Sequence, residues 1–259
     1  RDRTIIHIAP SHAEVDAHYS VSLAVVGNIR HSLNRIAALA TAHDGKALRI
    51  LRDSLIKEMN LHRDDTEFPV KPQKIIWDLR TAMDLEDIVV CDVGAHKMWM
   101  SRMFRCEYPN TCIISNGFAS MGIAVPGAIA AKLAHPERKV VAVTGDAGFL
   151  MNSQEIETAM RLHIPIVILI WNDASYGLIE WKQQNEFGRT SHVDFTNPDF
   201  VQYAQSFGAH GVRVERTEDL MPVLKQALAR DTVTVIDCPV DYRENLKLTE
   251  TLGQLTLST

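Results

Sequence analysis

Short apolar runs alternate with longer segments of helical periodicity over most of the chain. Buried strands are predicted at residues 88–91, 111–114, 139–144, 166–171, 212–214 and 232–237. Between them, apolar residues recur at helical spacing near residues 72–82, 120–133, 153–162, 199–207 and 218–229. Because the strands are apolar on both faces, each face needs a covering layer. The pattern therefore predicts an α/β fold, a doubly wound and mostly parallel sheet with helices on both faces.

The first part of the chain has a different pattern. Two short strands are predicted at residues 4–8 and 22–26, and an apolar stripe indicates a helix near residues 29–37. These elements are too few to close a sheet. Residues 43–71 are rich in charged side chains and end in a stretch that contains proline, which indicates a solvated helix followed by a linker.

This change of pattern predicts a domain boundary. The 259 residues have room for one large domain or one and a half, at roughly 100–200 residues per domain. We expect residues 1–65 to be the end of one domain plus a linker, and residues 66–259 to be a complete domain with a C-terminal tail. Because the chain starts without Met, at the edge of a predicted strand, we expect it to come from a longer protein.

Charge and composition argue against several classes of protein. The 27 Lys and Arg residues against 32 Asp and Glu residues give a net charge of −5 without any basic block, which argues against nucleic-acid and membrane partners. The longest apolar stretch, residues 164–171, is far shorter than the roughly 20 residues of a membrane span. The four cysteines lack the spacing of a zinc site or a disulfide framework, so a cytoplasmic location is expected.

The first candidate for chemistry follows the strand at residues 139–144. Asp146 lies between Gly145 and two further small residues, and a new helix is expected to open with a capping box formed by Asn152 and Glu155. A carboxylate in such a segment suits a hard cation, while free backbone amides beside it suit a phosphate. The alternative is a tight turn in which Asp146 only hydrogen-bonds the backbone.

A second carboxylate stands at the end of the next strand. Residues 166–171 run directly into Asn172 and Asp173. If the two strands are neighbours, Asp146 and Asp173 lie one strand apart, about 5 Å in the pairing direction. Magnesium takes few carboxylates and completes its octahedron with phosphate oxygens and water. Together the two strand ends predict a site for Mg²⁺ and a diphosphate.

These residues also carry a resemblance to a known family. Gly145-Asp146-Ala147, a spacer of 24 residues and then Asn172-Asp173 is similar to the thiamin-diphosphate-binding motif, which runs Gly-Asp-Gly, a spacer and Asn. The surrounding segments resemble acetolactate synthases, more closely the FAD-independent catabolic type, at residues 92–102, 114–122, 206–209 and 239–245. The resemblance spans essentially the whole chain, and it makes residues 1–40 similar to the end of the family's central domain.

The resemblance implies a role for individual residues. Asp146, Asp173 and the backbone carbonyl of Ser175 would bind Mg²⁺. Met121 would lie between the two rings of thiamin diphosphate and enforce its bent conformation, and the Ala119 carbonyl would accept a hydrogen bond from the aminopyrimidine. The other residues expected to surround the cofactor are Ala95, His96, Ala147, Gly148, Tyr176, Gly177 and Leu178. Without the resemblance, Met121 would be interpreted as a helix core residue and His96 as an ordinary histidine.

The resemblance further implies an activity and partners. Acetolactate synthases condense two pyruvates to 2-acetolactate and CO₂ through an enamine on the cofactor, as homodimers or homotetramers. Their catalytic Glu lies on the pyrimidine-binding domain of the partner subunit, and no residue of this chain can be assigned that role. We therefore expect the chain alone to be inactive. Other thiamin-diphosphate 2-keto acid decarboxylases or carboligases, and a non-catalytic cofactor-binding scaffold, stay open as alternatives.

Two positions depart from the family pattern. Ala147 replaces the Gly that is the third residue of the Gly-Asp-Gly motif. The replacement costs on the order of 1 to 2 kcal/mol if that position has a positive φ, and nothing if its φ is negative. Lys182 stands where relatives tend to carry Gln or Trp near the acceptor substrate. A cation there suits the carboxylate of a 2-keto acid, but it leaves the acceptor open; an exposed helical turn is the alternative.

Two other enzyme classes are excluded by missing motifs. A HAD-type phosphatase also places Gly-Asp near a strand end, but the chain has no DxDxT loop for its nucleophile. A dinucleotide-binding domain needs GxGxxG after a strand, whereas Gly117, Gly122 and Gly127 are spaced by five residues.

Overall fold

The computed structural model describes residues 4–11, 20–42, 44–246 and 248. The chain divides into two compact units, residues 1–53 and 54–259, which are described separately. This division lies earlier than the boundary predicted after residue 65. The end of the charged helix belongs to the second unit because Glu58 forms a bidentate ion pair with Arg102 there, at 2.7 and 2.8 Å.

The first unit contains two parallel strands and a helix. Strand β1 (Ile6–Ala9) pairs with β2 (Leu23–Val26), and α1 (Ile29–Leu39) follows. The side chain of Asn28 caps α1 by accepting a hydrogen bond from the amide of His31. The next helix, α2 (Lys46–Met59), contains the division between the units. These elements confirm the short strands and the helix predicted for this part of the chain.

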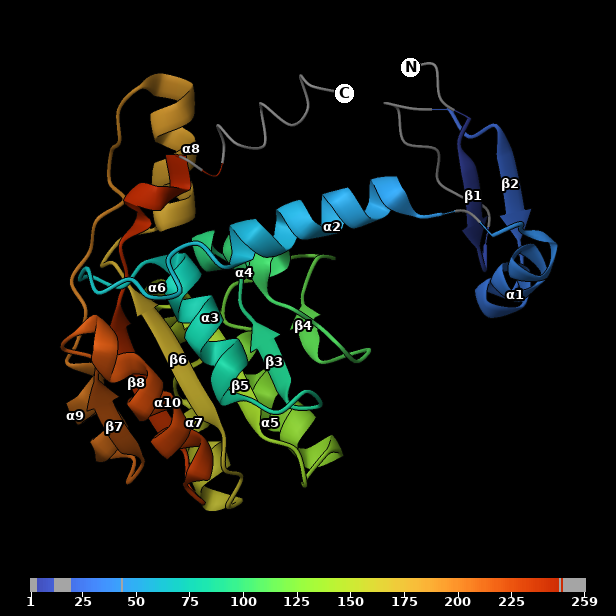
Figure 1. Ribbon diagram of the computed structural model, residues 1–259. Helices are drawn as coiled ribbons and strands as arrows, with labels where there is room; N and C mark the ends of the chain where they lie inside the picture. Colours follow the sequence, from blue (N-terminus) through green and yellow to red (C-terminus); the bar gives the residue numbers. More distant parts are fainter. Residues whose placement is uncertain (1–3, 12–19, 43, 247, 249–259) are drawn as a thin grey trace. The chain divides into compact units, whose positions relative to one another are not determined.

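A parallel sheet of six strands forms the centre of the second unit. Its strands are β3 (Ile88–Cys91), β4 (Cys112–Ile114), β5 (Val140–Gly145), β6 (Val167–Asn172), β7 (His210–Arg213) and β8 (Thr234–Pro239). Their order across the sheet is β4-β3-β5-β6-β8-β7 (Figure 1). After β3 the chain adds β4 on one side of β3 and then β5 on the other side. The carboxyl ends of β3 and β5 therefore form a topological switch point. Ligands bind at such points, beyond the carboxyl ends of the strands.

Helices cover both faces of this sheet, as the sequence predicted (Figure 1). The helices are α3 (Pro72–Ala82), α4 (Ala95–Met103), α5 (Ala124–Ala134), α6 (Asp146–Asn152), α7 (Glu155–Arg161), α8 (Gly177–Phe187), α9 (Phe200–Ser206) and α10 (Leu220–Ala229). Val89 and Cys91 of β3 belong to a core cluster with residues of α3, α4 and α10, whereas Ile88 and Val90 belong to a second cluster with residues of α5, α7 and α9. Each helix in the described part of the chain is too short or too polar to cross a lipid bilayer.

The structure corrects the predicted capping box. Helix α6 begins at Asp146, directly at the end of β5, and Asn152 is its last residue. The Asn152 amide donates to the Gly122 carbonyl at 2.9 Å, and the N-cap of α7 is Gln154. The apolar stripe that predicted a helix from residue 153 belongs to α7 alone. Helix α6 has only seven residues, too few to show helical periodicity in the sequence.

Candidate functional site

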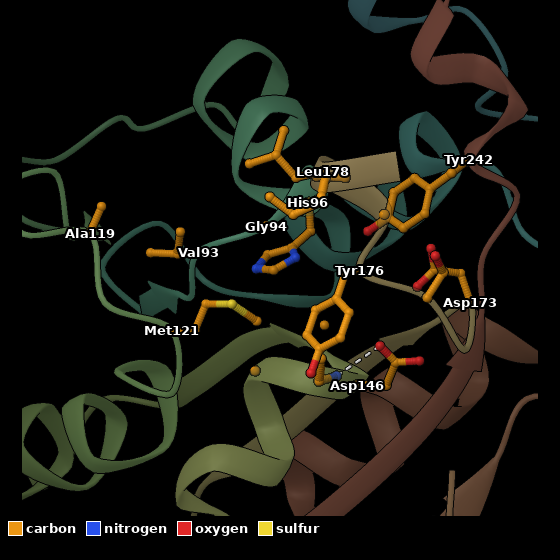
Figure 2. A pocket seen from close by; sticks show the side chains of 17 residues that line it. Val93, Gly94, His96, Ala119, Met121, Asp146, Asp173, Tyr176, Leu178 and Tyr242 are labelled. Carbon is orange, nitrogen blue, oxygen red and sulfur yellow. Dashed lines mark hydrogen bonds between the residues drawn. The ribbon is translucent and has the colours of Figure 1, made fainter. Parts of the chain in front are cut away.

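A cavity of about 220 Å³ lies beyond the carboxyl ends of β3, β5 and β6. Its walls come from the segments that follow these three strands, from the loop before α5 and from Tyr242 (Figure 2). The lining residues are Val93, Gly94, Ala95, His96, Ala119, Met121, Gly145, Asp146, Ala147, Gly148, Asp173, Ser175, Tyr176, Gly177, Leu178, Ile179 and Tyr242. The cavity therefore lies at the switch point of the sheet, where the fold favours ligand binding.

Asp146 is held in one orientation by several hydrogen-bond donors. Its carboxylate is 1 % exposed. One oxygen, Oδ1, accepts from the Ala147 amide at 2.8 Å. The other, Oδ2, accepts from the Ala174 amide and from Asn197 Nδ2, both at 2.7 Å. Burial raises the pKa of Asp146, and these donors counteract part of that effect because they favour the charged form.

Asp173 follows β6 on the neighbouring strand, on the same side of the cavity as Asp146 (Figure 2). Burial, the negative charge of Asp146 and that of Glu180 raise the pKa of Asp173 to about 8. A buried and a half-buried carboxylate that repel each other are a favourable place for a cation. Among the described residues, no three His, Cys, Asp or Glu side chains group into a metal site. The pair fits an ion that takes few protein carboxylates, as Mg²⁺ does.

The backbone around the cavity favours an anion, in contrast to the two carboxylates. Helices α4 and α8 begin there, at Ala95 and Gly177, so their first amides have no partner within the helix. Such amides bind the oxygens of a phosphate. At Gly177, a Cβ atom would lie 2.7 Å from Asp173 Oδ2, so this position has no room for a side chain. The cavity thus combines two carboxylates with free amide donors.

His96 contributes a polar atom that lacks a partner. Its side chain is buried, it lines the cavity, and its Nε2 makes no hydrogen bond within the described residues. Burial lowers the pKa of His96 to about 4, so the ring is neutral near pH 7. Because an unpaired buried nitrogen is costly, the position fits a ligand that supplies the missing hydrogen bond.

The wall across from the carboxylates is formed by the loop between β4 and α5. Figure 2 shows Met121 and Ala119 on that side, with His96 between them and Asp173. Asp92, at the end of β3, holds the loop by accepting from the amides of Gly122 and Ala124, each at 2.9 Å. Met121 therefore lines a ligand cavity, although its apolar neighbours alone would suggest a core position.

The cavity is open on one side, and apolar residues stand at its rim. Tyr176 and Ile179 line it and are 41 % and 49 % exposed, and Phe118 beside Ala119 is fully exposed. Large exposed apolar side chains around a cavity are typical of a surface that another domain covers.

The structure brings together the predicted cofactor and metal residues, all of which line the cavity. Lys182, the predicted substrate residue, is exposed on α8 and does not line the cavity. Ala147 lies in the first turn of α6, so its φ is negative and the Cβ is harmless. Sequence reasoning missed Tyr242 and Asn197. Tyr242 lies in a segment that resembles the family, whereas no motif points to Asn197.

This arrangement is typical of a domain that binds a phosphorylated cofactor at the switch point of its sheet. Residues 92–238 match the family model described as "Thiamine pyrophosphate enzyme, C-terminal TPP binding domain". Thiamine pyrophosphate is thiamin diphosphate, and the chain belongs to this enzyme family.

Individual relatives extend the match to nearly the whole chain. "Acetolactate synthase" of Bacillus subtilis (strain 168) is 41 % identical over 252 residues, 95 % of this chain and 44 % of that protein. "Acetolactate synthase, catabolic" of Raoultella terrigena is 36 % identical over 98 % of this chain and 46 % of its own length. "Probable acetolactate synthase large subunit" of Methanocaldococcus jannaschii is 31 % identical over 97 % and 44 %. The chain spans less than half the length of these relatives.

Proposed function

We propose that this chain is the cofactor-binding part of an acetolactate synthase, which condenses two pyruvates to 2-acetolactate and CO₂. The observation that carries the proposal is the cavity at the switch point, with two repelling carboxylates on one side and Met121 on the other. The names of the relatives support the reaction, and the match to the thiamin-diphosphate family supports the cofactor.

The residues of the cavity would divide the work of holding the cofactor. Asp146, Asp173 and the carbonyl of Ser175 would bind Mg²⁺. The amides of Gly148, Gly177, Ala95 and Leu178 would bind the diphosphate. Ala147 and Tyr176, whose own amides are hydrogen-bonded to Asp146 and Val193, would surround it with the ring of His96. Met121 and the Ala119 carbonyl would orient the rings. Bound thiamin diphosphate supplies an electron sink for decarboxylation and carbon–carbon bond formation at a 2-keto acid.

The protein's own contribution is orientation and the exclusion of water. Asp146 is fixed by its hydrogen bonds, so it requires little rearrangement when an ion binds. Neutral His96 adds no positive charge to the site and offers a hydrogen bond. Trp171 is fully buried next to the rings of His96 and Tyr242, with ring centroids 6.2 Å away in each case. Trp171 thus packs against two residues that line the cavity.

The open, apolar rim supports a second half of the site on another domain. We propose that the catalytic Glu lies on a pyrimidine-binding domain of the partner subunit in a homodimer or homotetramer, and that residues 1–65 are the end of a preceding domain and its linker. The chain alone is then inactive. The four free cysteines support a cytoplasmic location, and the net charge of −5 gives no support to nucleic-acid or membrane partners.

The alternative within the family is another 2-keto acid decarboxylase or carboligase. Lys182 is exposed and lies outside the cavity, and no Lys or Arg of the described residues lines the cavity. The cavity therefore does not indicate where the carboxylate of an acceptor substrate binds, and this favours retaining the alternative. A role of Lys182 at the acceptor substrate stays a prediction that depends on the covering domain. A cofactor-binding scaffold without turnover is the third candidate.

The test is to supply the full-length protein with pyruvate, Mg²⁺ and thiamin diphosphate and to identify the product. Formation of 2-acetolactate supports the proposal, and free acetaldehyde as the main product favours a decarboxylase. Cofactor binding without any consumption of 2-keto acids favours the scaffold. Turnover by residues 1–259 alone would contradict the need for a second domain.

A further inference from the structure

A row of buried and half-buried polar side chains starts at Asp146 and continues away from the cavity. Asn197 Nδ2 donates to Asp146 Oδ2 at 2.7 Å and to Asn172 Oδ1 at 3.0 Å. Asn172 Nδ2 in turn donates to Asp237 Oδ1 at 2.8 Å. Arg213 lies 3.4 Å from the other oxygen of Asp237. The row thus links the ends of β5, β6, β7 and β8.

Only the first member of this row can touch a ligand. Asp146 lines the cavity, whereas Asn197, Asn172 and Asp237 do not. Asn197 comes from the segment between α8 and α9 and lies 51 residues from Asp146 in the sequence. A direct role in ligand contact is therefore excluded for Asn197 in this structure, and its effect has to act through Asp146.

Asn197 is suited to fix the orientation of the Asp146 carboxylate. It shares Oδ2 with the Ala174 amide, so this oxygen is held from two directions, while Oδ1 accepts from the adjacent Ala147 amide. The second hydrogen bond of Asn197, to Asn172, prevents its own amide from turning away. As a neutral donor, Asn197 orients Asp146 without cancelling the negative charge that attracts a cation.

We propose that Asn197 is a positioning residue for the divalent cation, acting on Asp146 from outside the cavity. Asn172 and Asp237 hold Asn197 in place through the hydrogen bonds from Asn197 to Asn172 and from Asn172 to Asp237. The inference rests on the proposed function, because it takes Asp146 as a ligand of the ion. Groups that hydrogen-bond to metal ligands typically change metal affinity 10- to 100-fold when they are removed. The same range is expected here.

The experiment measures Mn²⁺ binding to the full-length protein at saturating thiamin diphosphate, by the electron paramagnetic resonance of free Mn²⁺. Asn197→Ala should weaken Mn²⁺ binding about 10- to 100-fold. The matched control is Tyr203→Phe, which removes a partly buried hydrogen bond between α9 and Ser153, at 2.8 Å, without touching the row. The control should bind Mn²⁺ like the wild type.

The outcomes separate this inference from the proposed function. If the wild type itself binds no Mn²⁺ with the cofactor present, the proposed cofactor site fails. If the wild type binds Mn²⁺ and the affinity of Asn197→Ala is unchanged, only the role of Asn197 is overturned. Should Asn197→Ala fail to fold, Asn172→Ala decides: a several-fold weaker affinity supports the inference and an unchanged one refutes it.

Discussion

Replacing Asp173 with Asn should stabilise the metal-free protein at pH 8. Asp173 is half-buried beside Asp146 and near Glu180, and its desolvation and these two neighbours raise its pKa from 3.8 to about 8. The folded state therefore holds a proton on Asp173 that the unfolded state releases above about pH 4. Stability from this group is greatest below pH 4 and is lost progressively as the pH rises to 8. Asn remains neutral at every pH, so it avoids that loss.

The size of the effect follows from the pKa. A displacement from 3.8 to about 8 corresponds to an upper limit of about 6 kcal/mol at 1.36 kcal/mol per pKa unit. Water and neighbouring dipoles rearrange when a carboxylate near a cavity ionises, which lowers the effective repulsion. We therefore expect Asp173→Asn to raise the free energy of unfolding by ~1–3 kcal/mol at pH 8, and by much less at pH 4.5.

The assay is urea unfolding of both proteins in the presence of a chelator, at pH 4.5 and at pH 8. Tryptophan fluorescence reports the transition, because Trp171 is fully buried and lies next to the site. Other carboxyls with raised pKa values, such as Asp92 and Asp237, contribute equally to both proteins, so the difference isolates Asp173. A variant that is less stable than the wild type at pH 8, or a difference that does not grow with pH, would refute the reasoning.

Three further predictions concern the cavity and the core. Ala147→Gly should cost about 0.5–1 kcal/mol in urea unfolding because Ala147 is helical, and calorimetry should show unchanged thiamin diphosphate affinity; tighter binding would contradict this. Met121→Ala should weaken thiamin diphosphate but not inorganic diphosphate in calorimetric titrations, and equal weakening of both would refute its placement at the rings. Phe149→Ala should cost ~3–5 kcal/mol in urea unfolding, because Phe149 is 1 % exposed and contacts Phe200 and Tyr203 edge-on; a loss under ~1 kcal/mol would show that this core is not tightly packed.

The sheet could be predicted from the sequence because its strands are buried on both faces. Runs such as residues 167–171 are apolar and buried throughout, and this continuous pattern marks a strand between two layers of helices. The predicted neighbours β5 and β6 do pair, which brings the ends of both strands to one edge. Two carboxylates at these ends were therefore predictable without any knowledge of the loops.

Other parts of the site left no pattern in the sequence. Helix α6 is too short for apolar periodicity, so its start at Asp146 was interpreted as a turn. Asn197 reaches Asp146 from 51 residues away, through a chain path that only the folded structure defines. Met121 required the family resemblance, because an apolar residue before a helix is more often part of a core. Tertiary contacts, rather than local sequence, determine these features.

The central claim is that Asp146 and Asp173 bind a cation together with a diphosphate, and thermal unfolding tests it most directly. The melting temperature of the chain should rise with Mg²⁺ and thiamin diphosphate together and with neither alone, because the ion and the diphosphate complete each other's coordination. Asp146→Ala should abolish the rise. No increase for the folded wild type at millimolar concentrations of both ligands, or an equal increase in Asp146→Ala, would contradict the account.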